Sequence, residues 1–240
     1  VSLFVASAVS SFHNKCEMVQ MFSLKTIGSV EHELTTPDCA VFYTPVYRLI
    51  FSLYANHLAS QQIDRLVEAK DRVSVQSCAF NTKNIVLIIG ESLGRHHSQQ
   101  YGYFMKTTPR QIALEKAGNL IPFTDVVAPW NLTSFVFKNI FSMHVVGQKG
   151  EWCDYPLFPQ LFRKAGYHVS FITNQFLPQA KEAVYDFSGG FFLNNKELSK
   201  SMFDTRNTRL HTYDEGLLAD YDNKLKAENR EYNLIIFHLI

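Results

Sequence analysis

The stretch Asn84-Ile-Val-Leu-Ile-Ile-Gly-Glu-Ser92 decides the fold of this 240-residue chain. Its continuous apolar run, rich in β-branched residues and closed by Gly90, is typical of a strand buried on both faces of a parallel sheet. Glu91 follows this strand directly. Open α/β sheets bind ligands at the carboxyl ends of their strands, so we interpret Glu91 as a candidate ligand for a divalent metal. The alternative is a surface or helix-capping carboxylate.

Downstream of this strand, helical and extended patterns alternate. Thr108-Pro109 predicts a helix start and Gly118 its stop, because proline suits the first helical turn and glycine suits the position after the last one. The further expected elements are helices over 133–144, 158–165 and 213–229 and strands over 168–173 and 233–240. This alternation predicts an α/β fold with a mainly parallel central sheet.

Upstream of the strand, the chain has a different character. Thr44 and Pro45 are a suitable cap and first residue for a helix that continues to Ala69, with apolar residues at helical spacing. The apolar run at residues 1–9 is shorter than the roughly 20 residues that span a bilayer. It fits a small buried helix or the end of a transmembrane helix. We expect the end of a transmembrane helix at 1–15, a helical linker at 16–80 and the catalytic domain at 81–240.

Composition excludes some classes of function. The net charge is +1 and the basic residues are scattered, so no basic face indicates nucleic-acid binding. The four cysteines, Cys16, Cys39, Cys78 and Cys153, are widely spaced and form no CxxC pair, which argues against a structural zinc site. They fit disulfides in an oxidising compartment and buried free thiols equally well.

Thr133 starts one of the predicted helices, in Trp130-Asn-Leu-Thr-Ser-Phe135. A threonine there is commonly a plain helix cap. The same position lets a hydroxyl act as a nucleophile, because a helix N-terminus stabilises negative charge and binds phosphate through free N–H groups.

Three polar residues end the other two predicted strands. Asn174 and Gln175 follow the strand at 168–173 and could donate hydrogen bonds to a phosphate, although an ordinary polar turn explains them as well. His238 near the end of the last strand is a candidate for the rim of the site, or a structural histidine. Asp186-Phe-Ser-Gly-Gly-Phe-Phe-Leu-Asn194 predicts a glycine-hinged loop, either packed or in contact with a lipid or acceptor.

Taken together, these segments resemble the membrane-anchored phosphoethanolamine transferases that modify lipopolysaccharide, within the sulfatase and alkaline phosphatase superfamily. The resemblance runs from about residue 40 to the end, and it depends on the order and spacing of several modest motifs. These are Asn84–Ser92 with His97 and Tyr101-Gly-Tyr103, then Thr107-Thr-Pro109, Asn131-Leu-Thr-Ser134 with Ile140-Phe-Ser142, Phe158–Tyr167 with Asn174, and Tyr213-Asp-Glu215 with Asn233–His238.

The resemblance implies an alkaline-phosphatase-like sandwich, preceded by the helical linker and incomplete at its C-terminus. It implies that Glu91 binds Zn²⁺ together with Thr133, and that Thr133 is the phosphate-accepting nucleophile. Asn174, Gln175 and His238 would contact substrate. The donor would be phosphatidylethanolamine, the acceptor lipid A or a core sugar, and the location the periplasmic side of a bacterial inner membrane.

Two departures qualify the resemblance. Many family members flank the threonine with a cysteine pair, whereas Trp130 and Asn139 occupy that neighbourhood here. The family's remaining Asp-His metal ligands lie further downstream, so we expect this chain to be an inactive fragment. The alternatives are a sulfatase, which would need a C/S-x-P-x-R motif that the sequence lacks, a phosphoglycerol transferase, or a non-catalytic periplasmic interaction domain.

Overall fold

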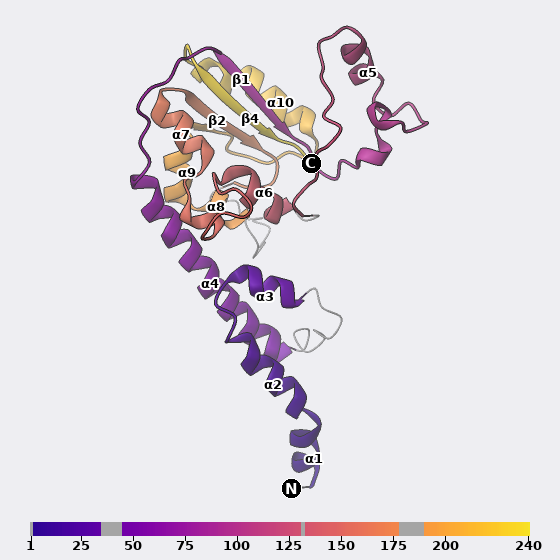
Figure 1. Cartoon of the computed structure of the whole chain (residues 1–240), viewed down its shortest axis with the longest axis vertical. Helices are drawn as coiled ribbons and strands as arrows, with labels where there is room; N and C mark the ends of the chain where they lie inside the picture. Colours follow the sequence, from indigo (N-terminus) through magenta and orange to yellow (C-terminus); the bar gives the residue numbers. More distant parts are fainter. Residues whose placement is uncertain (1, 35–44, 131–132, 178–189) are drawn as a thin grey trace.

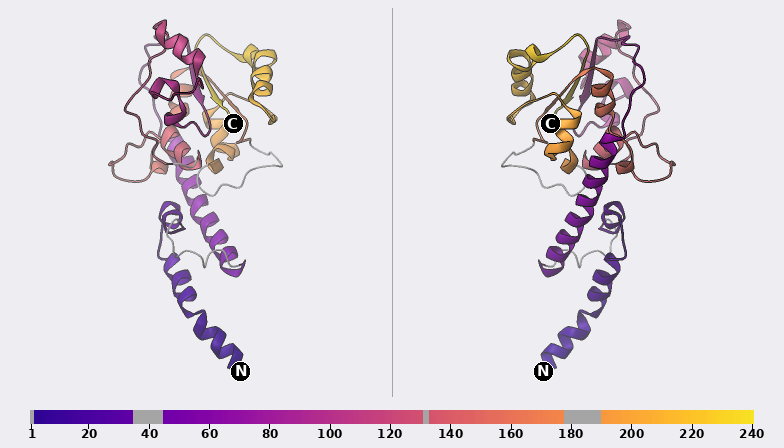
Figure 2. Two further views of the ribbon diagram at one scale, coloured as in Figure 1. Left: turned by 90° about the vertical axis from the view of Figure 1, so that its right-hand side faces the viewer. Right: turned by 90° about the vertical axis from the view of Figure 1, so that its left-hand side faces the viewer.

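The computed structural model describes residues 2–34, 45–130, 133–177 and 190–240. It has an α/β body and an arm of helices that projects from it, with the N-terminus at the far end of the arm (Figures 1 and 2). The body contains a parallel sheet in the order β1-β4-β2-β3. Its strands are β1 (Asn84–Ile89), β4 (Asn233–His238), β2 (His168–Thr173) and the short β3 (Thr205–Arg206). The α/β fold with a parallel sheet is therefore confirmed.

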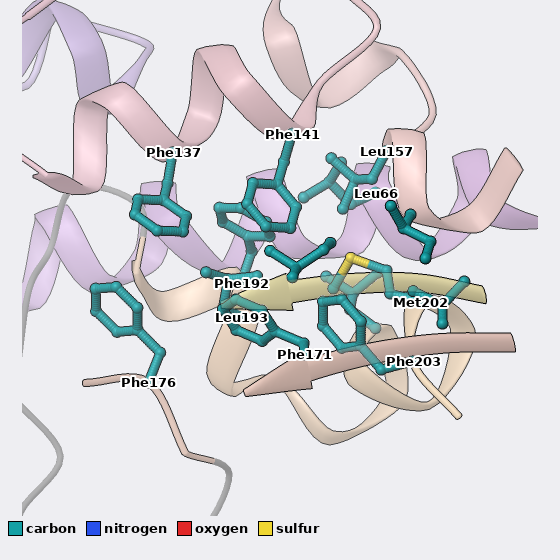
Figure 3. Close-up of a cluster of buried hydrophobic side chains, with 14 of the residues drawn as sticks. Leu66, Phe137, Phe141, Leu157, Phe171, Phe176, Phe192, Leu193, Met202 and Phe203 are labelled. Atoms are coloured by element: carbon teal, nitrogen blue, oxygen red, sulfur yellow. The ribbon is translucent and has the colours of Figure 1, made fainter. Parts of the chain in front are cut away.

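The helices of the body divide between the two faces of the sheet. The main core lies on the face covered by α6, α7, α8, α9 and the C-terminal half of α4 (Figure 3). The other face packs against α10 and the short helix η5. The bounds are α5 (Pro109–Lys116), α6 (Thr133–Phe141), α7 (Phe158–Ala165), α8 (Gly190–Asn194), α9 (Lys196–Met202), α10 (Asp214–Asn223), η2 (Arg95–His97), η3 (Gln99–Tyr101), η4 (Trp152–Asp154) and η5 (Leu225–Glu228).

The arm consists of α1 (Ser2–Ser10), α2 (Phe12–Met21), α3 (Ile27–Leu34) and α4 (Pro45–Asp71). Residues of α2, α3 and α4 form a small core of their own, which includes Met21, Ile27 and Leu58. The C-terminal half of α4 buries Ile63 and Leu66 in the main core of the body. One long helix thus joins the two parts. In the ranges that the structure covers, no helix is both long and apolar enough to cross a membrane.

Local sequence explains why α7 begins and ends where it does. Pro159 occupies the first turn, and Gln160 Oε1 accepts a hydrogen bond from the backbone N–H of Leu157 at 3.1 Å. Gly166 follows the helix with a φ of 104°, a conformation that favours glycine. The predictions for α5, α7 and β2 are confirmed, and the predicted helix from Pro45 runs slightly past Ala69. The predicted cap Thr44 lies outside the described residues.

The prediction that β1 is buried on both faces is wrong. Val86 and Ile88 are 53% and 63% exposed, while Ile85, Leu87 and Ile89 pack against the main core. The reason is the position of β1 at the edge of the described sheet, where β4 is its neighbour. Helix α10 packs over Ile172 of β2 and over Ile235 and Phe237 of β4. Val86 and Ile88 of β1 do not belong to that cluster.

Four other expected elements differ from the structure. The strand expected over 233–240 ends at His238, as β4. Helix α6 ends at Phe141 instead of residue 144, because Ser142 pairs with Leu157 in an antiparallel bridge. The helix expected over 213–229 is divided into α10 and η5, with Lys224 in a non-helical conformation between them. Part of the expected loop at 186–194 is helical, as α8, and residues 186–189 lie outside the described residues.

Of the cysteines that the structure describes, Cys16, Cys78 and Cys153 are free thiols, and Cys39 lies outside the described residues. Burial raises the pKa of the Cys153 thiol to about 12, although Arg65 opposes the shift. Cys153 is therefore a neutral core residue at physiological pH.

Candidate functional site

Glu91 stands just past the carboxyl end of β1, on a tight turn. Gly90 ends the strand, and Ser92 adopts a φ of 51°, in the left-handed region that non-glycine residues rarely occupy. Backbone strain of this kind concentrates at functional sites, where the surrounding structure holds it. The turn directs the Glu91 side chain toward the start of α6 and the end of β4, as its hydrogen bonds show.

Thr133 is the first residue of α6, and its hydroxyl contacts this carboxylate. Thr133 Oγ1 donates a hydrogen bond to Glu91 Oε1 at 2.7 Å. The positive end of the helix dipole and the free N–H groups of the first turn lie at the same place. A hydroxyl oxygen and a carboxylate 42 residues apart are thus brought together where negative charge is stabilised.

His238 completes the cluster from the end of β4, where its side chain is fully buried. Its Nε2 lies 3.3 Å from Glu91 Oε1, and its Nδ1 lies 3.0 Å from Thr173 Oγ1. The rings of Phe137 and Phe176 flank it, with centroids at 4.6 and 5.4 Å. Burial lowers the pKa of His238, and Glu91 opposes the shift, so the imidazole is neutral at physiological pH.

The surrounding hydrogen bonds determine which nitrogen of His238 carries the proton. Thr173 Oγ1 accepts from the backbone N–H groups of Gln175 and Phe176, at 3.1 and 3.3 Å. A hydroxyl has two acceptor sites and one proton, so the Thr173 proton is left to donate to Nδ1 of His238. The proton of the neutral ring is then on Nε2, where it donates to Glu91 Oε1.

A cavity of ≈ 450 Å³ opens onto Glu91 and Thr133. Its wall includes the turn from Ile89 to Gly94 and the side chains of Trp130, Val136 and Phe137. Apolar and aromatic walls around a few convergent polar groups are typical of ligand sites. The cavity therefore leaves space for a ligand group beside the Glu91–Thr133 pair.

The five residues singled out in the sequence do not all meet here. Glu91, Thr133 and His238 come together, whereas Asn174 turns toward α10: its Nδ2 donates to Asp214 Oδ1 at 2.8 Å and its Oδ1 accepts from the His211 backbone N–H at 3.1 Å. Gln175 contributes its backbone N–H to Thr173. The substrate-binding roles of Asn174 and Gln175 stay predictions.

Sequence reasoning missed the residues that support His238. Thr173 is in register with His238 across the β2–β4 pair, and Phe137 lies one turn after Thr133 on α6. The strand register, had it been inferred, would have indicated Thr173. Nothing local to Phe137 or Phe176 distinguishes them from other core phenylalanines.

The chemistry of these side chains fits part of a zinc site. Zinc binds carboxylate oxygen and imidazole nitrogen, and a hydroxyl can take the place of its bound water. Glu91 and Thr133 would hold the ion, with the imidazole of His238 behind the carboxylate. Within the described part of the chain, no group of three or more His, Cys, Asp or Glu side chains could hold a metal ion. The described residues therefore supply an incomplete ligand set.

Comparison with known proteins agrees with the fold. Residues 83–240 match the family model described as Sulfatase. Phosphoethanolamine transferase EptC of Escherichia coli O18:K1:H7 is 28% identical over 159 residues, and phosphoethanolamine transferase CptA of Salmonella typhimurium is 27% identical over 159 residues. Each alignment covers 66% of this chain and 27% of the relative. The resemblance noted in the sequence is thereby confirmed.

A solved structure is also similar. The C-terminal periplasmic domain of EcEptC from Escherichia coli, determined in complex with Zn, superposes with a TM-score of 0.52 at 26% identity. The match covers 66% of this chain and 43% of that domain. The chain thus spans about a quarter of the length of the curated relatives and less than half of the solved domain.

Proposed function

The chain belongs to the sulfatase family, and from this premise we propose that it is part of a phosphoethanolamine transferase. In this proposal the donor is phosphatidylethanolamine, the acceptor is lipid A or a sugar of the lipopolysaccharide core, and the phosphoethanolamine passes through a covalent intermediate on Thr133. The observation that carries the proposal is the hydrogen bond of 2.7 Å between Thr133 Oγ1 and Glu91 Oε1, at the mouth of a cavity and at the start of α6.

Thr133 acts as the nucleophile. Its proton points at Glu91, so an oxygen lone pair is left to attack the phosphorus of the donor. The Oγ1–phosphorus bond forms, the bond from phosphorus to the diacylglycerol oxygen breaks, and diacylglycerol leaves with a proton. A hydroxyl or phosphate oxygen of the acceptor then attacks the same phosphorus, the bond from phosphorus to Oγ1 breaks, and Oγ1 takes up the proton that the acceptor group releases. The N–H groups of the first turn of α6 stabilise the charge on the transferring group.

Glu91 and His238 prepare this hydroxyl. A zinc ion held by Glu91 and Thr133 would lower the pKa of the hydroxyl. His238 fixes the carboxylate by donating from Nε2, and Phe137 and Phe176 fix the imidazole. Asn174 and Gln175 remain candidate phosphate ligands at the neighbouring strand end. The reaction would take place on the periplasmic side of the inner membrane.

A labelling experiment on the full-length protein in membranes tests the proposal. The protein is incubated with phosphatidylethanolamine that is isotopically labelled in its headgroup, and peptides are searched by mass spectrometry for phosphoethanolamine on Thr133. We expect the adduct in the wild type and none in Thr133→Ala, with transfer to the acceptor lost by at least about 10³-fold, within the range for a covalent nucleophile. Thr133→Ser is the matched control, because it keeps a hydroxyl and should keep part of the activity.

Other results would redirect the assignment. Undiminished transfer by Thr133→Ala would exclude its role as the nucleophile. An adduct formed from phosphatidylglycerol instead of phosphatidylethanolamine would make the protein a phosphoglycerol transferase. No adduct from either lipid, in folded protein supplied with zinc, would favour a non-catalytic interaction domain.

A further inference from the structure

A second cavity, of ≈ 250 Å³, lies behind α6, between the arm and the body. Gly28 of α3 and Gln62 of α4 line it from the arm. From the body, the lining includes the side chains of Trp130, Phe135, Lys138, Asn139, Glu151 and Trp152. Trp130 also lines the cavity in front of Thr133, so the two cavities share this residue in their walls.

The walls of this cavity are aromatic. The rings of Trp130 and Phe135 stack at a tilt, with centroids 4.7 Å apart. The Lys138 ammonium lies 4.8 Å from the centroid of the Phe135 ring and 5.8 Å from that of Trp152. The cation-attracting faces of these two rings are therefore already occupied by a cation of the chain itself, which disfavours an ammonium ligand.

The charges on the wall nearly balance. Lys138 contributes one positive charge and Glu151 one negative charge, and Glu151 also forms an ion pair with Arg65. A strongly anionic group would face the Glu151 carboxylate, so a free phosphate would be an unfavourable ligand for this cavity. The wall also includes the imidazole of His144 and the amides of Gln62 and Asn139, and each amide both donates and accepts hydrogen bonds.

One donor in this wall lacks a partner. Trp152 Nε1 is buried and has no hydrogen-bond acceptor among the residues that the structure describes. A buried, unsatisfied N–H is costly, so an oxygen of a ligand in the cavity would be a favourable partner for Nε1 once the indole shifts toward it. Asn139 Nδ2 donates to the Phe135 carbonyl at 2.8 Å, which holds the amide against α6.

These features together fit a neutral ligand that carries hydroxyl groups and has an apolar face. A sugar ring has both: its C–H groups pack on the negative face of an aromatic ring, and its hydroxyls pair with amide, carboxylate and indole groups. We propose that the cavity lined by Trp130, Lys138, Asn139 and Trp152 binds a sugar ring of the acceptor saccharide.

The position of the cavity suits the transfer reaction proposed above. The identification of the sugar as the acceptor rests on that proposed function. Thr133 begins α6, and Lys138 lies five positions later on the same helix, which is about 7.5 Å along the axis. A sugar seated behind Trp130 thus lies close to the nucleophile without occupying its cavity. The donor and the acceptor would have separate places.

Direct binding tests the proposal without any donor. The full-length protein in detergent micelles is titrated by calorimetry with lipid-free core oligosaccharide, released from lipopolysaccharide by mild acid. Asn139→Ala and Trp152→Phe each remove one hydrogen-bonding group, so we expect each to raise the Kd about tenfold, the effect of one lost hydrogen bond to a ligand. Phe104→Ala is the control, since Phe104 is exposed and far from this wall in the sequence.

A second readout separates binding from general damage. In Asn139→Ala the labelling of Thr133 by donor lipid should be unchanged, and the KM for the acceptor should rise while kcat stays constant. Wild-type affinity for the oligosaccharide in both variants would overturn the proposal, as would displacement of the oligosaccharide by ethanolamine or inorganic phosphate. If Thr133 is never labelled in the wild type, the proposed function fails while the calorimetry still decides whether a sugar binds here.

Discussion

One face of the sheet packs against α4, α6, α7, α8 and α9 through a cluster rich in phenylalanine, whereas the other meets α10 and η5 over β2 and β4. On this second face Val86 and Ile88 of β1 are exposed to solvent. Ile89, Thr173 and His238 are in register and face the densely packed side. The candidate site therefore depends on the same packing that stabilises the body. One face of the sheet both holds the site and forms the main core.

The largest loss of stability should come from a substitution at the centre of the packed face. Phe141 is fully buried, and its ring lies 5.2 to 5.9 Å from those of Phe158, Phe171 and Phe192. Phe141→Ala should lower the free energy of unfolding by about 3–5 kcal/mol, the usual cost of removing a buried phenylalanine. Urea unfolding followed by circular dichroism measures it.

Phe141→Leu is the matched control and should cost clearly less, because it keeps most of the apolar volume. A loss below about 1 kcal/mol in Phe141→Ala would mean that the packing of this face is not what stabilises the sheet.

An intermediate effect is expected on the opposite face, where electrostatics contributes. Asp220 of α10 accepts hydrogen bonds from Arg209 at 2.8 and 3.0 Å and lies 2.6 Å from His211 Nε2. Arg209 and then His211 hold the pKa of Asp220 well below its usual range. Asp220→Asn should cost about 1–2 kcal/mol at pH 7, less than the full range for hydrogen bonds to a charged group because the Arg209 side chain is 60% exposed and solvent weakens the pair.

The pH dependence follows from the direction of that shift. A carboxyl with a depressed pKa in the folded state contributes its stability above the unfolded pKa of about 4 and loses it as the pH falls through the folded pKa. The difference between wild type and Asp220→Asn should therefore shrink below pH about 4, which urea unfolding at pH 7, 4 and 3 would show. A constant difference over this range would exclude the ion pair as its source.

The smallest effect should come from the exposed side of β1. Ile88 is 63% exposed, so Ile88→Ala removes little buried surface and should cost no more than about 1 kcal/mol. The matched control is Leu87→Ala, one residue along the same strand but packed against the main core. A loss for Ile88→Ala in the full-length protein as large as that for Leu87→Ala would show that something covers this face there.

The contrast between the faces also explains what the sequence could predict. Signals for α5, α7 and β2 lie within a few residues of each element, such as Pro159, Gln160 and Gly166 for α7, so their bounds were predictable. The exposure of Val86 depends on which strand forms the edge, a property of the whole sheet that no local pattern contains.

The site shows the same division. Glu91 and Thr133 stand out as candidates in the sequence because each follows or begins a predicted element at a position where ligands commonly bind. Their contact with each other and with His238 joins residues 42 and 147 positions apart, and strand order determines it. The second cavity, which Trp152 helps to line, forms only where the arm and the body meet, and neither part of the sequence indicates that arrangement alone.

The number of residues in helix α4 determines the distance between the arm and the body. Its 27 residues span about 40 Å if the helix is straight, and its two ends are embedded in two different cores. The helix therefore fixes both the distance between the arm and the body and the rotation of one relative to the other around the helix axis. Seven residues inserted between its two packed zones would move the body by about 10 Å along the axis and turn it by only about 20°, whereas two inserted residues would turn the cavity beside Glu91 by about 200° around the axis.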